Sequence, residues 1–244
     1  VFAFITRRNT IMSFAQELTP EQAVLAYLWG ESTHSFASQP HKAGESVRIV
    51  GTDPFIIGSR ASKVNRFYEI IMTLVSNFPG KIKFMQYNTG GMGEIIEISE
   101  EDGKQKKKLV RKVNRVPINL MADIQRGDLR GTNLYERGIL GTKDIKRVTG
   151  KDLTDWDVHK FYSEDQIQYY IKDLVEGRRK YTEEIAAEGL RDEVLYAVER
   201  SFRIDKSGKK TESLEPDATV SEDKSFYDLE SKSRPRRGGF WRTK

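Results

Sequence analysis

The sequence predicts an α/β fold in which helices flank a mixed β-sheet. Short apolar runs typical of strands alternate along the chain with longer segments whose apolar residues recur at helical spacing. Of the 244 residues, 37% are hydrophobic, which is enough to build a sizeable core. We expect strands at residues 2–5 and 83–87 to be neighbours in one sheet, with a helix that begins at Pro20 packed on it.

The first half of the chain holds most of the predicted sheet. Residues 1–5 form a continuous apolar run, as in a strand that is buried on both faces. Thr19 and Gln22 have the spacing of a capping box, which predicts a helix from Pro20 that ends at Gly30. The following segments are predicted, in order, as a loop at 31–45, strand and turn at 47–57, a helix at 64–78 and a strand at 83–87.

A β-hairpin and a second group of helices are predicted further on. Residues 95–98 and 109–113 flank Asp102-Gly103, a pattern typical of a hairpin, here with a basic exposed arm. Ser163 and Gln166 form a second capping box at the start of a long helix. The other segments are predicted as a short helix at 117–126, a connecting loop at 127–150, an interruption of the long helix at Gly177 and a last helical turn at 194–198.

These segments suggest three regions along the chain. Residues 1–130 form the mixed α/β region, and residues 131–203 form a linker with a helical C-terminal appendage. Residues 204–244 are poor in apolar residues and rich in Ser, Lys, Glu and Asp, so we expect a flexible, disordered tail.

Composition excludes several classes of protein. No apolar run approaches the roughly 18 residues of a membrane helix, and no secretory signal is recognisable, so we expect a cytoplasmic protein with no membrane partner. The absence of cysteine excludes disulfides and cysteine zinc sites. The 41 basic residues face 36 acidic ones, and much of the excess lies in runs at 104–115 and 234–244 that are typical of solvated surfaces. We therefore expect no nucleic-acid partner.

Four blocks of sequence occur in an order that is found in a known family. They are Leu18-Thr19 with Gln22, Gly30-Glu31-Ser32-Thr33, the segment 50–55, and the segment 84–90 that ends in Asn88-Thr89-Gly90. In this order the blocks resemble the C-terminal region of the ATP-type phosphoenolpyruvate carboxykinases, over residues 1–130. The resemblance implies the C-terminal lobe of a carboxykinase-like fold. Because the chain begins within a predicted strand, we expect an N-terminal part of the same enzyme as its partner.

The resemblance implies that the loop at residues 30–51 is a mobile lid. Gly30, Gly44 and Gly51 would give it hinge freedom, while Ser32 and Thr33 would offer hydrogen-bonding groups. An ordinary surface loop is the alternative. Two of the three histidines, His34 and His41, lie on this loop without the spacing of a metal pair, and we interpret them as solvated.

The resemblance also implies a nucleotide site. Asn88, Thr89 and Gly90 would lie near the base or ribose of ATP, and the Arg115 guanidinium would stack on the adenine with Val116 beside it. A charged segment, 94–113, stands between the turn and Arg115 where the family has only a few residues. Arg111 is therefore an equal match, and a surface arginine is the alternative for both. Arg7 and Arg8 follow the first strand, where phosphate or carboxylate ligands often bind.

The parent reaction implied by the resemblance converts oxaloacetate and ATP to phosphoenolpyruvate, carbon dioxide and ADP with Mg²⁺ and Mn²⁺. The phosphate-binding loop and the metal ligands of the family lie upstream of the matched blocks, so this chain alone is expected to have no catalytic residues. Two alternatives stay open. One is a non-catalytic basic binding or assembly module for an anionic partner, and the other is a family member that has lost or changed the reaction.

Overall fold

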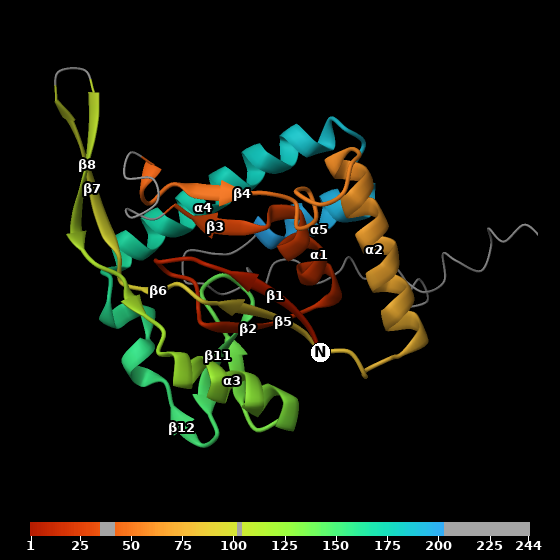
Figure 1. Ribbon diagram of the computed structural model, residues 1–244, viewed down its shortest axis with the longest axis horizontal. Coiled ribbons are helices and arrows are strands. Elements are labelled where there is room, and N and C mark those ends of the chain that lie inside the picture. The colour runs from red at the N-terminus through yellow and green to blue at the C-terminus, as the bar shows by residue number, and fades with distance from the viewer. Residues whose placement is uncertain (35–41, 102–103, 203–244) are drawn as a thin grey trace, which may run out of the picture. The chain divides into compact units, whose positions relative to one another are not determined.

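A computed structural model describes residues 1–34, 42–101 and 104–202, and Figure 1 shows their arrangement. The helices are α1 (Pro20–Trp29), α2 (Arg60–Asn77), α3 (Ile118–Arg130), α4 (Glu164–Ala186) and α5 (Asp192–Phe202). The first strands are β1 (Phe2–Thr6), β2 (Ala15–Leu18), β3 (Glu31–Thr33), β4 (Ser46–Arg48), β5 (Phe84–Asn88) and β6 (Gly91–Met92). The later strands are β7 (Ile95–Glu101), β8 (Lys104–Arg111), β9 (Asn114–Arg115), β10 (Leu134–Arg137), β11 (Lys143–Val148) and β12 (Lys151–Asp152).

The largest sheet has the strand order β1-β5-β2-β11-β10, with β12 paired to β11. β1 and β5 are parallel, with Phe2 opposite Phe84, whereas the other pairs are antiparallel. The predicted α/β class with a mixed sheet is therefore confirmed, as is the pairing of the two predicted strands.

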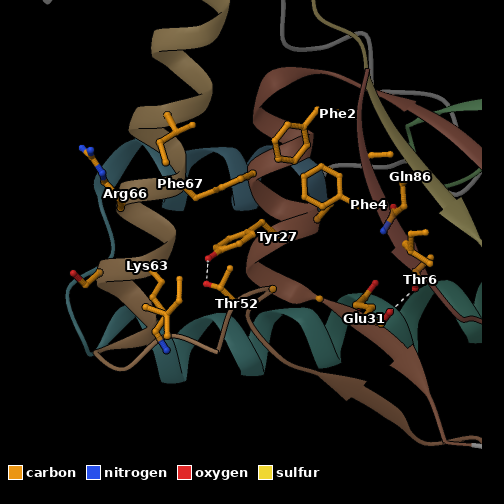
Figure 2. A pocket seen from close by; sticks show the side chains of 18 of the residues that line it. Phe2, Phe4, Thr6, Tyr27, Glu31, Thr52, Lys63, Arg66, Phe67 and Gln86 are labelled. Carbon is orange, nitrogen blue, oxygen red and sulfur yellow. Dashed lines mark hydrogen bonds between the residues drawn. The ribbon is translucent and has the colours of Figure 1, made fainter. Parts of the chain in front are cut away.

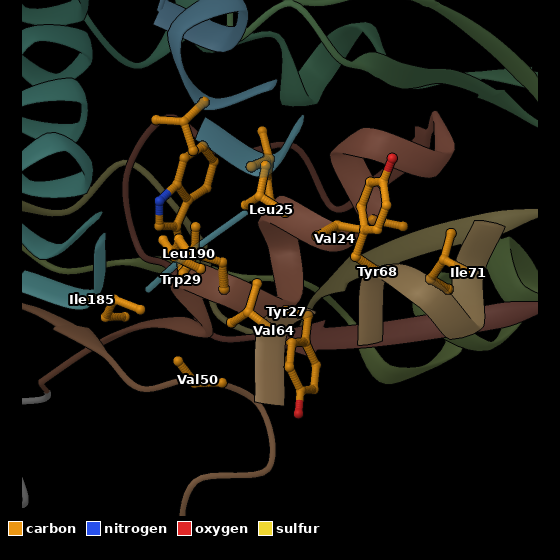
Figure 3. Packing of buried hydrophobic residues seen from close by; sticks show 14 of the residues in the cluster. Val24, Leu25, Tyr27, Trp29, Val50, Val64, Tyr68, Ile71, Ile185 and Leu190 are labelled. Atoms are coloured by element: carbon orange, nitrogen blue, oxygen red, sulfur yellow. The ribbon is translucent and has the colours of Figure 1, made fainter. Parts of the chain in front are cut away.

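Helices flank both faces of this sheet. Phe84 lies in a core that α1, α2, α4 and α5 share, and Figure 3 shows the buried side chains of that core around Trp29 and Val64. Met85, the next residue of β5, points to the opposite face and packs with Met121 and Ile124 of α3. This alternation of adjacent residues explains why β5 is buried along its whole length.

The two predicted capping boxes are confirmed. The Thr19 hydroxyl accepts a hydrogen bond from the backbone N–H of Gln22. In return, the side-chain oxygen of Gln22 accepts one from the backbone N–H of Thr19. Ser163 and Gln166 make the same exchange at the start of α4. The predicted interruption at Gly177 was wrong, because α4 continues through it. A Cβ on Gly177 would lie 2.5 Å from a guanidinium nitrogen of Arg48, so this glycine leaves room for an arginine.

Two segments predicted as loops contain strands. Residues 31–45 begin with β3, which pairs with β4 as an antiparallel hairpin. The segment 127–150 contains the last turn of α3 and then β10 and β11, which extend the main sheet. The region 131–203 thus supplies strands and core helices to the same body as residues 1–130. The predicted tail, 204–244, lies outside the described residues.

A buried aspartate joins α3 to the sheet. The Asp128 carboxylate accepts hydrogen bonds from the Tyr87 hydroxyl at 2.8 Å, the Tyr135 hydroxyl at 2.7 Å and the Asn133 side-chain amide at 2.7 Å. Burial, together with the hydrogen bonds to Asp128, raises the pKa of both tyrosines. Asp128 therefore connects the end of α3 to β5 and β10. Within the described ranges, no helix has the length and apolar character needed to cross a membrane.

Candidate functional site

The turn that follows β5 is held by Asn88. This residue is fully buried, and its side-chain oxygen accepts hydrogen bonds from the backbone amides of Arg8 at 2.8 Å and Gly90 at 3.0 Å. Its side-chain nitrogen donates to the Met12 carbonyl at 3.1 Å. All polar atoms of the Asn88 side chain are thus used inside the protein. Asn88 shapes the predicted site without presenting its amide to a ligand.

The rest of the turn packs closely against the segment after β1. Thr89 donates its backbone amide and its hydroxyl to the Thr6 carbonyl, at 2.9 and 3.1 Å. A Cβ on Gly90 would lie 2.0 Å from the Arg8 carbonyl oxygen, so only glycine fits there. The exposed face of the Thr89 side chain is the part of the turn that a ligand can reach.

The structure brings this turn together with Arg115 and Val116. β6 pairs with β9, which places Gly91 opposite Arg115. The Val116 amide donates to the Gly90 carbonyl at 3.4 Å. Arg115 is exposed and Val116 is half-buried, and the Arg115 side chain forms no hydrogen bond or ion pair with any described residue. The residues of the predicted nucleotide site therefore adjoin one another, with a free guanidinium beside the turn.

The charged segment between the turn and Arg115 is an antiparallel hairpin of β7 and β8 that projects from the body (Figure 1). Because both ends of the hairpin return to the β6–β9 pair, the insertion leaves Gly91 and Arg115 side by side. Arg111 lies at the hairpin base and donates to the carbonyls of Gly93 and Phe161, with its guanidinium 5.2 Å from the Tyr162 ring centre. Of the two arginines predicted as candidates, Arg111 is thus already engaged through its side chain and Arg115 is not.

A buried carboxyl group adjoins this site. Glu94 is 8% exposed and accepts a hydrogen bond from the Asn9 side-chain amide at 3.0 Å. Burial raises the pKa of Glu94, while the Asn9 hydrogen bond and the charges of Arg115 and Arg7 act in the opposite direction. The side-chain oxygen of Asn9 is buried and has no partner among the described residues. Neither Glu94 nor Asn9 was predicted as a site residue; the only signal was the position of Glu94 directly after the glycine-rich turn.

The described part of the predicted lid is a short hairpin stem, and its three glycines are closely packed. Residues 35–41 of this loop lie outside the described residues. A Cβ on Gly30 would meet the Ile49 carbonyl, one on Gly44 the Ile96 side chain, and one on Gly51 the Tyr27 ring. These glycines are therefore positions of close contact between segments.

The stem is joined to the rest of the protein on two sides. The Thr33 amide and the Ser32 hydroxyl donate to the Arg7 carbonyl at 3.0 and 3.5 Å. On the other side, Glu45 forms an ion pair with Lys107 of the inserted hairpin. His34 lies at the described end of the stem, where its backbone bonds to Gly44 and Glu45. His41 lies outside the described residues.

Buried charges join the stem to α4. Glu31 forms ion pairs with Arg48 at 3.0 Å and Arg178 at 2.6 Å, and its side chain is 2% exposed. Burial alone would raise the pKa of Glu31, but Arg178, Arg8 and Arg48 lower it to about 2. Arg8, predicted as a possible ligand residue, is itself buried and donates to the Ser32 carbonyl and the Ser46 hydroxyl. It is part of this cluster, whereas Arg7 is exposed.

No group of three histidine, aspartate or glutamate side chains within the described ranges is placed to hold a metal ion. No protein-family model matches the sequence, and a search of curated proteins finds no match either.

Proposed function

We propose that this chain is the C-terminal part of a carboxykinase-like enzyme and supplies the wall against which the adenine of ATP binds. The proposal includes a cytoplasmic setting and an N-terminal part that carries the phosphate-binding loop and the Mg²⁺ and Mn²⁺ ligands. The reaction would be the conversion of oxaloacetate and ATP to phosphoenolpyruvate, carbon dioxide and ADP.

One observation carries the proposal: the Asn88–Gly90 turn adjoins Arg115 and Val116, although a long hairpin separates them in sequence. An exposed guanidinium can stack on a purine, and the half-buried valine beside it offers apolar contact. The hairpin gives less support to a basic binding module. Glu97 stands opposite Lys108 in its register, and Lys107 is paired with Glu45, so part of its positive charge is compensated.

Replacing Arg115 by alanine is expected to weaken ATP binding by about 1–2 kcal/mol, which is about 5- to 30-fold in affinity. Replacement by lysine should restore little, because an ammonium group offers no flat face to the base. ATP titrations of the full-length protein, followed by NMR chemical shifts, measure both effects. Lys112→Ala is the matched control, since it removes an exposed positive charge three residues away and should leave ATP affinity unchanged.

The same titrations test the basic-module alternative. If the positive charge of the surface as a whole binds an anionic polymer, Arg115→Lys will hardly change the affinity for that polymer. The affinity for a single-stranded DNA oligonucleotide will then fall steeply with salt. That result, with ATP affinity equal in wild type and Arg115→Lys, would contradict the proposed nucleotide wall.

The isolated chain is expected to form no phosphoenolpyruvate from oxaloacetate and ATP. Phosphoryl transfer needs metal ions and a phosphate cradle to neutralise charge on the transferring group, and the proposal places both in the N-terminal part. A coupled assay with Mg²⁺ and Mn²⁺ present tests this, with addition of a separately expressed N-terminal part as the positive control. Metal-dependent turnover by this chain alone would show that the assignment of roles is wrong.

A further inference from the structure

β1 is the end strand of the main sheet, and part of its outer edge faces no strand of the described chain. The Phe2 amide bonds to Lys83 at 2.7 Å, and the Thr6 carbonyl accepts from Thr89 at 2.9 Å. Backbone groups alternate in direction along a strand, so Ala3 and Ile5, between these inward residues, point their N–H and C=O groups outward. Both residues are exposed, and the Ile5 side chain is 70% exposed.

Just beyond β1, the same edge of the sheet is already paired with β3. Arg7 and Ser32 form a parallel bridge, and the Thr33 amide donates to the Arg7 carbonyl at 3.0 Å. β3 thus begins to extend the sheet just beyond β1. The place beside Ala3 and Ile5, in line with β3, has no strand among the described residues.

A groove runs along this vacant place. It has a volume of about 630 Å³ and lies between β1, α1, α2 and the loop at 51–59. Figure 2 shows Phe2 and Phe4 of β1 beside Phe67 of α2 and Tyr27 of α1. The Phe67 ring centre lies 5.7 Å from that of Phe2 and 6.0 Å from that of Phe4, so these rings adjoin one another along the groove. The Tyr27 and Phe67 rings are stacked with centres 4.1 Å apart. One face of α2 therefore lines a groove, at the position where a helix of an α/β fold normally covers a strand.

Further apolar side chains near the groove are exposed to solvent. Ile57 and Ile56 line the groove with exposures of 103% and 51%, and the neighbouring Phe55 is 86% exposed. Clustered exposed apolar groups of this kind mark interaction sites. The α2 wall carries positive charge in Lys63, which pairs with Asp53, and in Arg66, which pairs with Glu69 at 2.9 Å although its side chain is 74% exposed. Glu31, at the far end of the groove, is neutralised by two arginines.

We propose that the open edge of β1 binds an apolar β-strand from another polypeptide segment. The backbone of that strand would pair with Ala3 and Ile5, and one row of its side chains would enter the groove. Its other row would cover Ile5, so large apolar residues suit both rows, as in strands buried on both faces. An acidic residue suits the end that passes Arg66. The inference rests on the proposed function only for the identity of the segment, which would be the N-terminal part of the enzyme.

A second copy of this chain fits the groove less well. If two copies paired β1 with β1 around a two-fold axis, both α2 helices would lie over the same sheet face next to the shared edge. Each α2 lines the space beside its own β1, so the two helices would compete for that space. A single extended strand avoids this conflict.

The test uses a fluorescein-labelled peptide with the core Val-Ile-Val-Ile-Val, an aspartate at one end and two lysines for solubility at the other. Fluorescence anisotropy with the whole chain should show saturable binding. Ile57→Ser should weaken it about tenfold through lost apolar contact. Ala3→Pro should abolish it, because proline removes an outward N–H while the bonds of Phe2 and Thr6 to β5 remain. Ile118→Ser is the matched control, since it removes an isoleucine that is 87% exposed on α3 and should leave binding unchanged.

Three results would overturn the inference. The first is absence of binding at millimolar peptide. The second is equal binding of a peptide whose alternate amides are N-methylated, which would indicate non-specific apolar adhesion. The third is a dimer in sedimentation equilibrium that Ala3→Pro abolishes, which would identify a second copy as the occupant. The assay contains no nucleotide, so Arg115→Ala should bind the peptide like wild type, and failure of the nucleotide proposal stays distinguishable from failure of this one.

Discussion

Replacing Glu31 by alanine is expected to reduce the free energy of unfolding by about 3–5 kcal/mol, the range for removing one partner from a buried ion pair. The loss arises mainly from the arginines that remain. Arg48 and Arg178 lose their counter-charge while their side chains are only 10% and 14% exposed, and Arg8 nearby is also buried. Urea unfolding of wild type and variant at pH 7 measures the difference.

Two further variants make this prediction specific. Glu69→Ala removes a half-exposed carboxylate that pairs with Arg66 and Arg191, and it should change stability by less than about 1 kcal/mol. Glu31→Gln keeps the shape of the side chain but not its charge, and should be nearly as destabilising as alanine. A loss below 1 kcal/mol in both Glu31 variants would show that the cluster is not a stabilising element.

The same cluster predicts a pH dependence. Because the folded-state pKa of Glu31 is about 2 and its ordinary value is 4.5, its stabilising contribution is complete above 4.5 and is lost as the pH falls towards 2. Asp144 acts in the opposite direction. Burial raises its pKa to about 6 from 3.8, so its ionisation lowers stability as the pH rises through that interval. The difference between wild type and Glu31→Gln isolates the Glu31 contribution, and it should shrink only below pH 4.5.

Replacing Asp128 by alanine should reduce the free energy of unfolding by about 3 kcal/mol or more. Three donors would lose their acceptor, and the buried ones carry a penalty of about 1–3 kcal/mol each. Tyr87 is the least able to find water, since it is 5% exposed. Thermal unfolding of the variant measures the effect, with tyrosine near-ultraviolet circular dichroism as a local probe.

Asp123 provides the control for this substitution. It lies on the same helix, is exposed and has Arg126 as its one ion-pair partner among the described residues, so Asp123→Ala should be close to neutral. Equal effects of the two aspartate substitutions would indicate a change in helix propensity and not the loss of the buried hydrogen bonds.

Much of the fold could be predicted because local signals agreed with the final structure. The capping boxes at Thr19 and Ser163 determined two helix starts, since the side chain and the backbone of the first turn satisfy each other without help from the rest of the fold. The apolar run at β5 was recognisable because every residue of this strand is buried. The run at β1 was also recognised as a strand, but its predicted burial on both faces was wrong, since Ala3 and Ile5 are exposed at the edge of the sheet.

The strands that were not predicted lack the local sequence pattern of a strand. β11 carries four charged residues among its six, and its buried apolar residues Ile145 and Val148 are three apart, a spacing that resembles a loop or a helix more than a strand. Its place in the sheet comes from tertiary pairing with β2, in which Lys143 stands opposite Glu17. Such pairing is invisible in a local window.

The candidate site was predicted in its parts and not in its arrangement. The turn at residues 88–90 and Arg115 were both identified, but the sequence left Arg111 and Arg115 equivalent. Only the hydrogen bonds of Arg111 to Gly93 and Phe161 distinguish them. Glu31 was identified as part of a motif, while its role depends on Arg178, which is distant in sequence.

The strand order of the sheet has a consequence for synthesis on the ribosome. β2, at residues 15–18, pairs on one side with β5 and on the other with β11, which ends at Val148. In the nascent chain, β2 therefore lacks one of its two pairing strands until β11 has emerged from the ribosome. Pairing between such distant segments slows folding and lengthens the time for which apolar strands are exposed. Release of the chain before residue 148 should leave it a substrate for chaperones, whereas a stop after α5 should not.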